Sequence, residues 1–231
     1  MDIRGFVPFT VVDYPGKLAS TVFCGGCNMR CPYCHNSHLV LHPDRQPRHS
    51  EHEVLSLLAN RIGKLEGVVV SGGEPCIQGP DLQAFLSRIK GMGFATKLDT
   101  NGTKPDVVGA LLCDGLIDML AVDVKNGPDR YAETSGVGRD WWPEVSETLR
   151  LAVATRIELE VRTTVHKRFH GEMDILRIRQ ELDTLGVGEW IVQRFVARGA
   201  IDKTLDEKSS WSREELSALV GQMKQTRLRP N

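Results

Sequence analysis

The sequence lacks the features that would mark a membrane, secreted or nucleic-acid-binding protein. It has no run of about 18 apolar residues, so no membrane span is expected. Its first residues, MDIRGFVPFT, lack a basic start followed by an apolar stretch, so no secretory signal is expected. The net charge is −1 and acidic and basic residues are interspersed, so the sequence has no basic patch of the kind that binds nucleic acid. We therefore expect a cytoplasmic protein with no nucleic-acid or membrane partner.

Low-complexity segments and repeated motifs are also absent, but a repeated pattern of elements is present. Apolar, β-branched runs predict six strands, and apolar residues at helical spacing predict five helices between or after them. The predicted strands cover 19–24, 67–71, 95–99, 117–124, 156–164 and 190–195. The predicted helices cover 51–63, 80–91, 104–113, 143–154 and 172–185.

Alternation of strand and helix predicts an α/β fold with a parallel sheet covered by helices. Six βα units are too few for a closed eightfold barrel, so the sequence favours a partial barrel, with a doubly wound sheet as the alternative. In both folds the chemistry lies at the carboxyl ends of the strands. Segment 196–231 contains one amphipathic helix, at about 211–225, and is expected to be an extension of the same domain.

Four of the six cysteines lie in CGGCNMRCPYCHN, residues 24–36. A structural zinc site is one interpretation, although its two cysteine pairs are usually separated by a longer stretch. A ferredoxin-type cluster is a second, although its cysteine spacing differs. A third is a four-iron cluster held by Cys27, Cys31 and Cys34, which leaves one iron open for a substrate.

The other three cysteines have separate expectations. Cys24 either completes a four-thiolate site or is a strand-end thiol beside the cluster. Cys76 and Cys113 are expected to be buried thiols.

The spacing of Cys27, Cys31 and Cys34, with Tyr33 before the last cysteine, resembles the signature of the radical S-adenosylmethionine (SAM) superfamily. SGGEP at 71–75 is similar to the superfamily's glycine-rich element. This resemblance implies a partial (β/α)6 TIM-like barrel over residues 1–195, a [4Fe-4S] cluster and S-adenosyl-L-methionine as cofactors.

A narrower resemblance extends over most of residues 5–195. The opening VDYPGKLASTVFCGGCNMRCPYCHN, with LDTNG at 98–102 and DVK at 123–125, is similar to the activases of glycyl radical enzymes. The extra ferredoxin-like cysteine insert of some activases is missing. The chain is most similar to the activating protein of anaerobic ribonucleoside-triphosphate reductase.

The resemblance also implies roles for individual residues. Cys27, Cys31 and Cys34 would ligate the cluster, with no further catalytic residue beyond cluster and cofactor. Glu74 would offer its carboxylate or carbonyl to the cofactor's ammonium group, and glycines at 72 and 73 permit close backbone approach. The remaining expected cofactor-binding residues are Tyr33, His35, Asn36, Gly72, Gly73, Asp99, Asp123, Lys125 and Arg162.

Each of these side chains also has a plain structural interpretation. Asp99 could cap the helix that follows DTNGTKP. Asp123 and Lys125 could form a simple ion pair, and Arg162 could pair with Glu160 at the surface. His166 and His170 are expected to be surface residues.

The activity implied is reductive cleavage of S-adenosylmethionine to a 5′-deoxyadenosyl radical that abstracts a hydrogen from a glycine of a partner enzyme. The implied partners are a glycyl radical enzyme, with anaerobic ribonucleotide reductase preferred, and a low-potential electron donor such as flavodoxin or ferredoxin. One alternative is a radical SAM enzyme acting on a small molecule, as in deazapurine synthesis. Another is a non-enzymatic metal-binding or electron-transfer protein.

Overall fold

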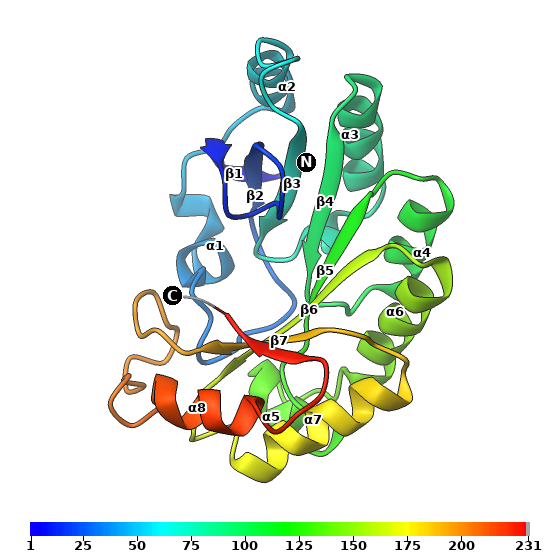
Figure 1. The fold of residues 1–231 in the computed structure, drawn as a ribbon. Helices are drawn as coiled ribbons and strands as arrows, with labels where there is room; N and C mark the ends of the chain where they lie inside the picture. Colours follow the sequence, from blue (N-terminus) through cyan, green and yellow to red (C-terminus); the bar gives the residue numbers. More distant parts are fainter. Residues whose placement is uncertain (230–231) are drawn as a thin grey trace. The chain divides into compact units, whose positions relative to one another are not determined.

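A computed structural model describes residues 1–229, and the strands within them follow one another in space as they do in sequence (Figure 1). They form one sheet in the order β1-β2-β3-β4-β5-β6-β7-β8. The strands are β1 (Ile3–Thr10), β2 (Ala19–Cys24), β3 (Gly67–Gly72), β4 (Ala95–Thr100), β5 (Met119–Asp123), β6 (Glu158–Val165), β7 (Trp190–Arg194) and β8 (Thr226–Leu228).

Helices separate most of these strands, and several begin where the sequence predicts. Pro80, Pro105 and Pro143 each lie in the first turn of a helix, where the missing N–H has no intrahelical partner to lose. The helices are α1 (Ser37–Leu41), α2 (Glu51–Ala59), α3 (Pro80–Gly91), α4 (Pro105–Cys113), α5 (Tyr131–Ser135), α6 (Trp142–Thr155), α7 (Glu172–Thr184) and α8 (Arg213–Val220), with short 3-10 helices at Pro43–Arg45, Pro75–Gln78 and Pro128–Arg130.

The sheet is mostly parallel and open, as the sequence predicts. β2 pairs in parallel with β3 and β3 with β4, while β6 and β7 pair in parallel, as do β7 and β8. β1 is antiparallel to β2 and lies at one end of the strand order, with β8 at the other end. β1 and β8 are additional to the six predicted strands. β1 contains Gly5 and Pro8, which weaken a strand pattern, and β8 has only three residues.

The described chain divides into two compact units. The first comprises Met1–Asn28, His38–Thr100 and Lys104–Ala121. The second comprises Met29–Ser37, Asn101–Thr103 and the chain from Val122 onward. The boundary passes through β5 and through the cysteine loop.

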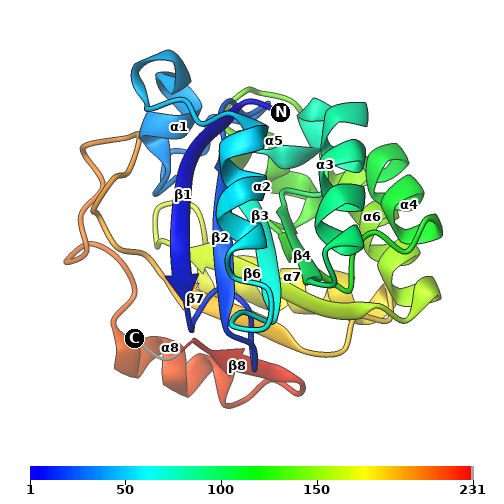
Figure 2. The same cartoon turned by 90° about the horizontal axis from the view of Figure 1, so that it is seen from above.

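In the first unit, helix α3 packs against β4 and α2 against β1 (Figure 2). β3 carries three fully buried valines in succession, as expected of a parallel strand covered on both faces. Near the amino ends of the strands, the Tyr14 ring packs with Ala19, Val69 and Met119. Tyr14 belongs to the VDYPG stretch, so this stretch precedes β2 whereas the cysteine loop follows it.

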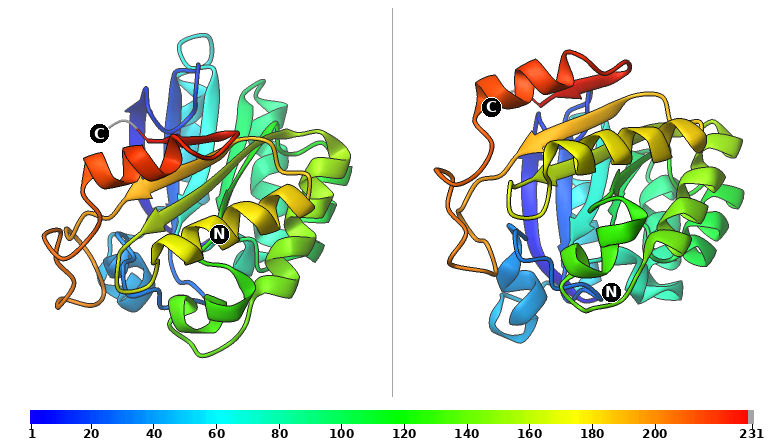
Figure 3. Two further views of the ribbon diagram at one scale, coloured as in Figure 1. Left: turned by 60° about the horizontal axis from the view of Figure 1, so that its bottom comes forward. Right: turned by 90° about the horizontal axis from the view of Figure 1, so that it is seen from below.

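In the second unit, α8 and β8 lie side by side and contact β7 (Figure 3). Helix α7 buries Ile175, Ile178 and Leu182. Trp190 of β7 is fully buried, and its Nε1 donates to Thr163 Oγ1 at 3.0 Å. The segment after residue 195 therefore contributes a strand as well as the expected helix, which is shorter than predicted.

Three predictions about individual side chains are wrong. Cys113 is exposed rather than buried, because it ends α4 on the helix face away from buried Val108 and Leu111. His166 and His170 are buried rather than at the surface. Cys76 is buried as predicted. Among residues 1–229, no helix has both the length and the apolar character needed to cross a bilayer.

Candidate functional site

The predicted site residues fall in both units, and most of them lie at or beyond the carboxyl ends of successive strands, whereas Arg162 lies within β6. The cysteine loop follows β2, the glycine-rich stretch follows β3, and Asp123 ends β5. The first unit contains Cys27, Gly72, Gly73, Glu74 and Asp99. The second contains Cys31, Tyr33, Cys34, His35, Asn36, Asp123, Lys125 and Arg162.

In the first unit, the glycine-rich stretch is bonded to the start of the cysteine loop. Gly73 N donates to Cys24 O at 2.9 Å, and Glu74 N donates to Gly26 O at 2.8 Å. A β-carbon at Gly72 would lie 2.3 Å from Cys24 N, and one at Gly73 would lie 1.8 Å from Gly26 O. Gly72 also has a φ of 124°, a conformation that side chains rarely adopt. These glycines are therefore required by backbone packing within the protein itself.

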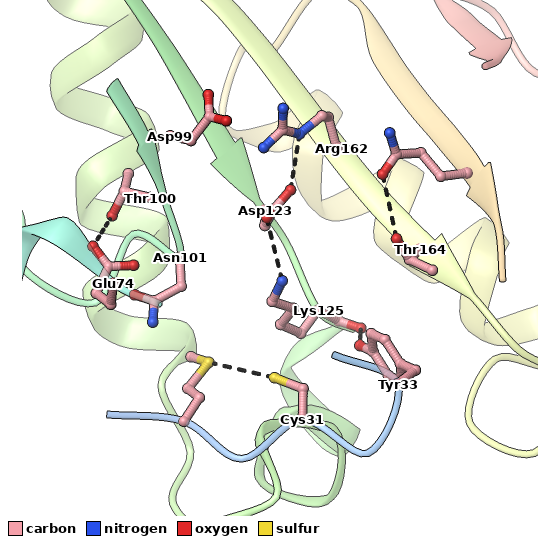
Figure 4. A network of polar contacts seen from close by, with 12 residues as sticks. Cys31, Tyr33, Glu74, Asp99, Thr100, Asn101, Asp123, Lys125, Arg162 and Thr164 are labelled. Carbon is pink, nitrogen blue, oxygen red and sulfur yellow. Dashed lines mark hydrogen bonds and ion pairs between the residues drawn. The ribbon is translucent and has the colours of Figure 1, made fainter. Parts of the chain in front are cut away.

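The Glu74 side chain is buried, with 1% of its surface exposed. Its Oε1 accepts a hydrogen bond from Thr100 Oγ1 at 2.6 Å (Figure 4). The same oxygen accepts from Cys76 N at 3.0 Å, which caps the 3-10 helix Pro75–Gln78. The carboxylate is therefore held in one orientation by the end of β4 and by its own following turn.

The cysteines of the first unit differ in their surroundings. Cys24 is fully buried at the end of β2, and burial together with the nearby Glu74 carboxylate raises the pKa of its thiol. Cys27 is half-buried, with its Sγ 4.0 Å from Asn28 Oδ1. A thiolate is the form that ligates metal, so the raised pKa of Cys24 counts against a ligand role for that cysteine.

Asp99 is held by two neighbours on the sheet. Lys97 Nζ lies 2.7 Å from Asp99 Oδ1, and Ser71 Oγ donates to Asp99 Oδ2 at 3.1 Å. Helix α4 begins at Pro105 with Lys104 as its N-cap residue, so Asp99 does not cap it. The capping interpretation of Asp99 is therefore wrong.

In the second unit, three charged side chains form a row (Figure 4). Arg162 Nε donates to Asp123 Oδ1 at 2.9 Å, and Lys125 Nζ lies 3.5 Å from Asp123 Oδ2. Burial alone would raise the pKa of Asp123, but Arg162 and Lys125 outweigh it and hold that pKa well below its usual range. Arg162 Nη1 also lies 3.2 Å from Glu160 Oε1, and Arg162 is only 9% exposed. The predicted pairs exist, but the one with Glu160 is not a surface contact.

Three aromatic side chains form hydrogen bonds with the backbone of Lys125. Its carbonyl accepts from Tyr33 Oη at 3.1 Å and from His170 Nε2 at 2.7 Å. Its N–H donates to Tyr131 Oη at 3.2 Å. The Tyr33 ring also packs edge-on against the His170 ring, at a centroid distance of 5.7 Å. Tyr131 and His170 were missed from the sequence, because no local pattern distinguishes them from ordinary core or surface residues.

His170 is fully buried, and this burial lowers its pKa to about 4. Its Nδ1 accepts from His166 N at 3.2 Å while Nε2 donates to the Lys125 carbonyl. This arrangement needs a neutral ring with its proton on Nε2, since a protonated Nδ1 would face the His166 N–H.

Cys31 and Cys34 lie in a turn in which Cys34 N donates to Cys31 O at 3.0 Å. Cys31 is buried with its Sγ 3.9 Å from Met29 Sδ, and Cys34 is half-buried. Burial raises the pKa of the Cys34 thiol, and the Lys125 ammonium opposes that shift. Within residues 1–229, where all six cysteines lie, no disulfide is present. A thiol beside a cation, as at Cys34, suits an iron–sulfur cluster, which thiolates hold.

Comparisons with known proteins show which family and which folds this chain is similar to. The model of the radical SAM superfamily matches residues 21–177. A protein of Methanocaldococcus jannaschii, provisionally named a glycyl-radical enzyme activating enzyme, is 31% identical over 222 residues, covering 94% of this chain and 89% of the relative. The 7-carboxy-7-deazaguanine synthase of Halobacterium salinarum is 31% identical over 147 residues, covering 61% of this chain and 52% of the relative.

Among solved structures, Streptococcus suis SuiB bound to the precursor peptide SuiA has a TM-score of 0.65 at 13% identity. The match covers 89% of this chain and 47% of SuiB, so this chain spans about half the length of that protein. The likeness concerns the fold alone and confirms the predicted partial-barrel class. The family model covers well over half of the chain and implies a [4Fe-4S] cluster and S-adenosylmethionine. The chain therefore belongs to the radical SAM superfamily.

Proposed function

We propose that this protein is a radical SAM activase that generates a glycyl radical on a partner enzyme. The observation that carries the proposal is the likeness to the M. jannaschii protein, which extends over 94% of this chain. The activase-like opening at 12–36 supports it, as do DTNG and DVK near the ends of β4 and β5. We further propose anaerobic ribonucleotide reductase as the partner, flavodoxin or ferredoxin as the electron donor, and the cytoplasm as the location.

In this proposal, Cys27, Cys31 and Cys34 hold the cluster. Bound together, the cluster and S-adenosylmethionine supply a 5′-deoxyadenosyl radical able to take a hydrogen atom from glycine. Cys24 stays a buried thiol, because burial and the Glu74 charge disfavour its thiolate. Residues 196–231 extend the domain of residues 1–195.

The remaining side chains bind and orient the cofactor. Glu74 and the backbone of Gly72 and Gly73 receive the ammonium end. Asp123, Lys125 and Arg162 form a rigid charged row for its polar groups, and Asp99 contributes a further carboxylate. Tyr33, His35 and Asn36 lie along the loop that carries the cluster ligands and contact the adenosyl part.

The first test is cleavage of the cofactor. The full chain is purified without oxygen, reconstituted with iron and sulfide, and incubated with dithionite and S-adenosylmethionine. We expect 5′-deoxyadenosine from the wild type and from the Cys113→Ala variant, whose thiol is exposed and outside the loop. We expect none from Cys31→Ala. Zinc binding without any cluster would overturn the proposal.

A second candidate, a radical SAM enzyme acting on a small molecule, is favoured by the partial match to the deazaguanine synthase. The two functions differ in the fate of the hydrogen atom. Incubation with the proposed partner, an anaerobic ribonucleotide reductase, should give the glycyl radical signal in electron paramagnetic resonance. Turnover of a small molecule of deazapurine synthesis, with no such signal, would favour the second candidate.

A further inference from the structure

The segment Val196–Asp202, which follows β7, contacts the part of the cysteine loop in the second unit (Met29–Ser37) at three points. His35 Nε2 lies 2.9 Å from Val196 O. Asp202 N donates to Pro32 O at 2.9 Å. Between these two bonds, the backbone of Gly199 lies directly against the carbonyl group of His35. The segment therefore borders the loop over the stretch that contains Cys34.

Gly199 shows how close this approach is. A β-carbon at Gly199 would lie 2.4 Å from His35 O and 3.6 Å from His35 Cα. The residue also has a φ of 83°, in the region that favours glycine. No other residue fits here without moving one of the two backbones.

The segment is itself held in place by contacts outside the loop. Asp202 Oδ2 pairs with Arg168 Nη1 at 3.0 Å, and Asp202 Oδ1 accepts from Thr204 N at 2.8 Å. Glu207 Oε1 accepts from Ala197 N at 3.0 Å. The segment is thus a support for the loop that is also bonded to parts of the chain outside it.

The other side of the loop is held in a similar way. Arg30 N donates to Ser135 O at 2.8 Å, and a β-carbon at Gly136 would lie 2.0 Å from Arg30 O. Cys31 and Cys34 lie between this contact at Arg30 and the contacts at Pro32 and His35. Their backbone positions are therefore set by α5 on one side and by 196–202 on the other.

We propose that segment 196–202 is a positioning element for the cluster loop, which holds Cys31 and Cys34 in the geometry that a cluster requires. The physical reason is entropic, because ordering a free loop costs about 1–2 kcal/mol per residue and a support bonded to other parts of the chain removes part of that cost. The proposal rests on the proposed function only for the statement that these cysteines ligate a cluster.

The test compares Gly199→Ala with Gly138→Ala. Both glycines have positive φ, but nothing lies within 4 Å of a β-carbon at Gly138, so this control carries the backbone strain without the collision. The cluster-free full chain is alkylated, and the rate is followed for each cysteine by peptide mass spectrometry. We expect Gly199→Ala to raise the rates of Cys31 and Cys34 about tenfold over the control, with exposed Cys113 unchanged.

After reconstitution, Gly199→Ala should also bind less iron per chain than Gly138→Ala. Equal alkylation rates in the two variants would overturn the proposal. If buried Cys24 and Cys76 also become reactive in Gly199→Ala, that variant has unfolded. The alkylation rates of a second variant, Arg168→Ala, then test the proposal. This variant removes the ion pair with Asp202, and unchanged rates of Cys31 and Cys34 in it would equally overturn the proposal. The alkylation experiment remains a valid test even if the wild type binds no cluster. Failure to bind a cluster would count against the proposed function and not against the positioning role of segment 196–202.

Discussion

The α-carbon of Gly73 lies so close to Gly26 that a β-carbon there would be 1.8 Å from the Gly26 carbonyl oxygen. Two backbone hydrogen bonds join the segments that contain these residues. Gly73 N donates to Cys24 O, and Glu74 N donates to Gly26 O. The glycine-rich stretch after β3 and the start of the cysteine loop therefore form one packed backbone structure. A substitution in one displaces the other.

Gly73→Ala should therefore lower the stability of the protein. We expect the free energy of unfolding to fall by about 1–3 kcal/mol, the usual cost of overpacking a close-packed site. Cluster incorporation should fall as well, because the displaced loop carries Cys27. Urea unfolding and iron content measure the two effects.

Gly91→Ala provides the control for this substitution. Gly91 ends α3 and has nothing within 4 Å of its β-carbon position. Alanine is favoured over glycine in helices by up to about 1 kcal/mol, so this variant should be unchanged or slightly more stable. Equal stability of the two variants would contradict the packing argument.

Arg162→Met tests the charged row of the second unit. The substitution removes the bonds to Asp123 and Glu160 and leaves two carboxylates with fewer partners. Hydrogen bonds to charged groups contribute about 1.5–3 kcal/mol each, so we expect a loss of about 2 kcal/mol in urea unfolding. Arg150→Met removes an exposed pair with Glu147 and should cost less than about 0.5 kcal/mol. Similar losses in both variants would show that the row contributes no more than a surface pair.

His170→Gln tests the pH dependence of stability. The pKa of His170 is lowered to about 4 in the folded protein, against an ordinary value of 6.5. Between these values the unfolded chain takes up a proton that the folded chain does not, so stability falls as pH falls from about 6.5 toward 4. One such group contributes a slope of up to about 1.4 kcal/mol per pH unit.

The glutamine variant cannot take up this proton, so its stability should fall less steeply over the same range. Chemical unfolding at pH 7.5, 6.5, 5.5 and 5.0 measures both slopes. His52→Gln, at an exposed position on α2, controls for the loss of a histidine and should match the wild type. Parallel curves for wild type and His170→Gln would refute the assignment of this pH dependence to His170.

Glu74→Gln separates cofactor binding from folding. The amide oxygen of glutamine can still accept from Thr100 Oγ1 and Cys76 N, so the free energy of unfolding should change by less than about 1 kcal/mol. If Glu74 receives the ammonium group of S-adenosylmethionine, loss of its charge should weaken binding about tenfold, as expected for a charge-assisted hydrogen bond. Isothermal titration calorimetry of the reconstituted protein measures the affinity. Unchanged affinity would exclude a role for the carboxylate charge.

Local patterns in the sequence predicted six strands and five helices, and the structure contains all of them. Apolar residues repeat every two residues in a strand and every 3.6 residues in a helix, and proline favours the first turn of a helix. These patterns depend only on neighbouring residues, and the strands and helices that they predicted are present. The errors on the two histidines concern side chains whose surroundings come from distant segments. His170 is buried by Lys125 and Trp211, residues 45 and 41 positions away in the chain. β8 pairs with β7 across more than 30 residues.

The glycine-rich stretch shows the same division. The two glycines predicted that the backbone there is closely approached, and a bound ligand was the expected neighbour. The structure supplies another reason, which is the contact with Gly26. No sequence pattern indicates that contact, because more than 40 residues separate the two glycines.

The sequence by itself determined the order of strands and helices, the thiol spacing and the family, because these depend on residue type and on separation along the chain. Only the tertiary structure decided that segment 196–202 supports the cysteine loop, that Cys24 is buried beside Glu74, and that His170 bonds the Lys125 carbonyl. Each of these depends on which distant backbones pack together, and packing is a property of the whole fold.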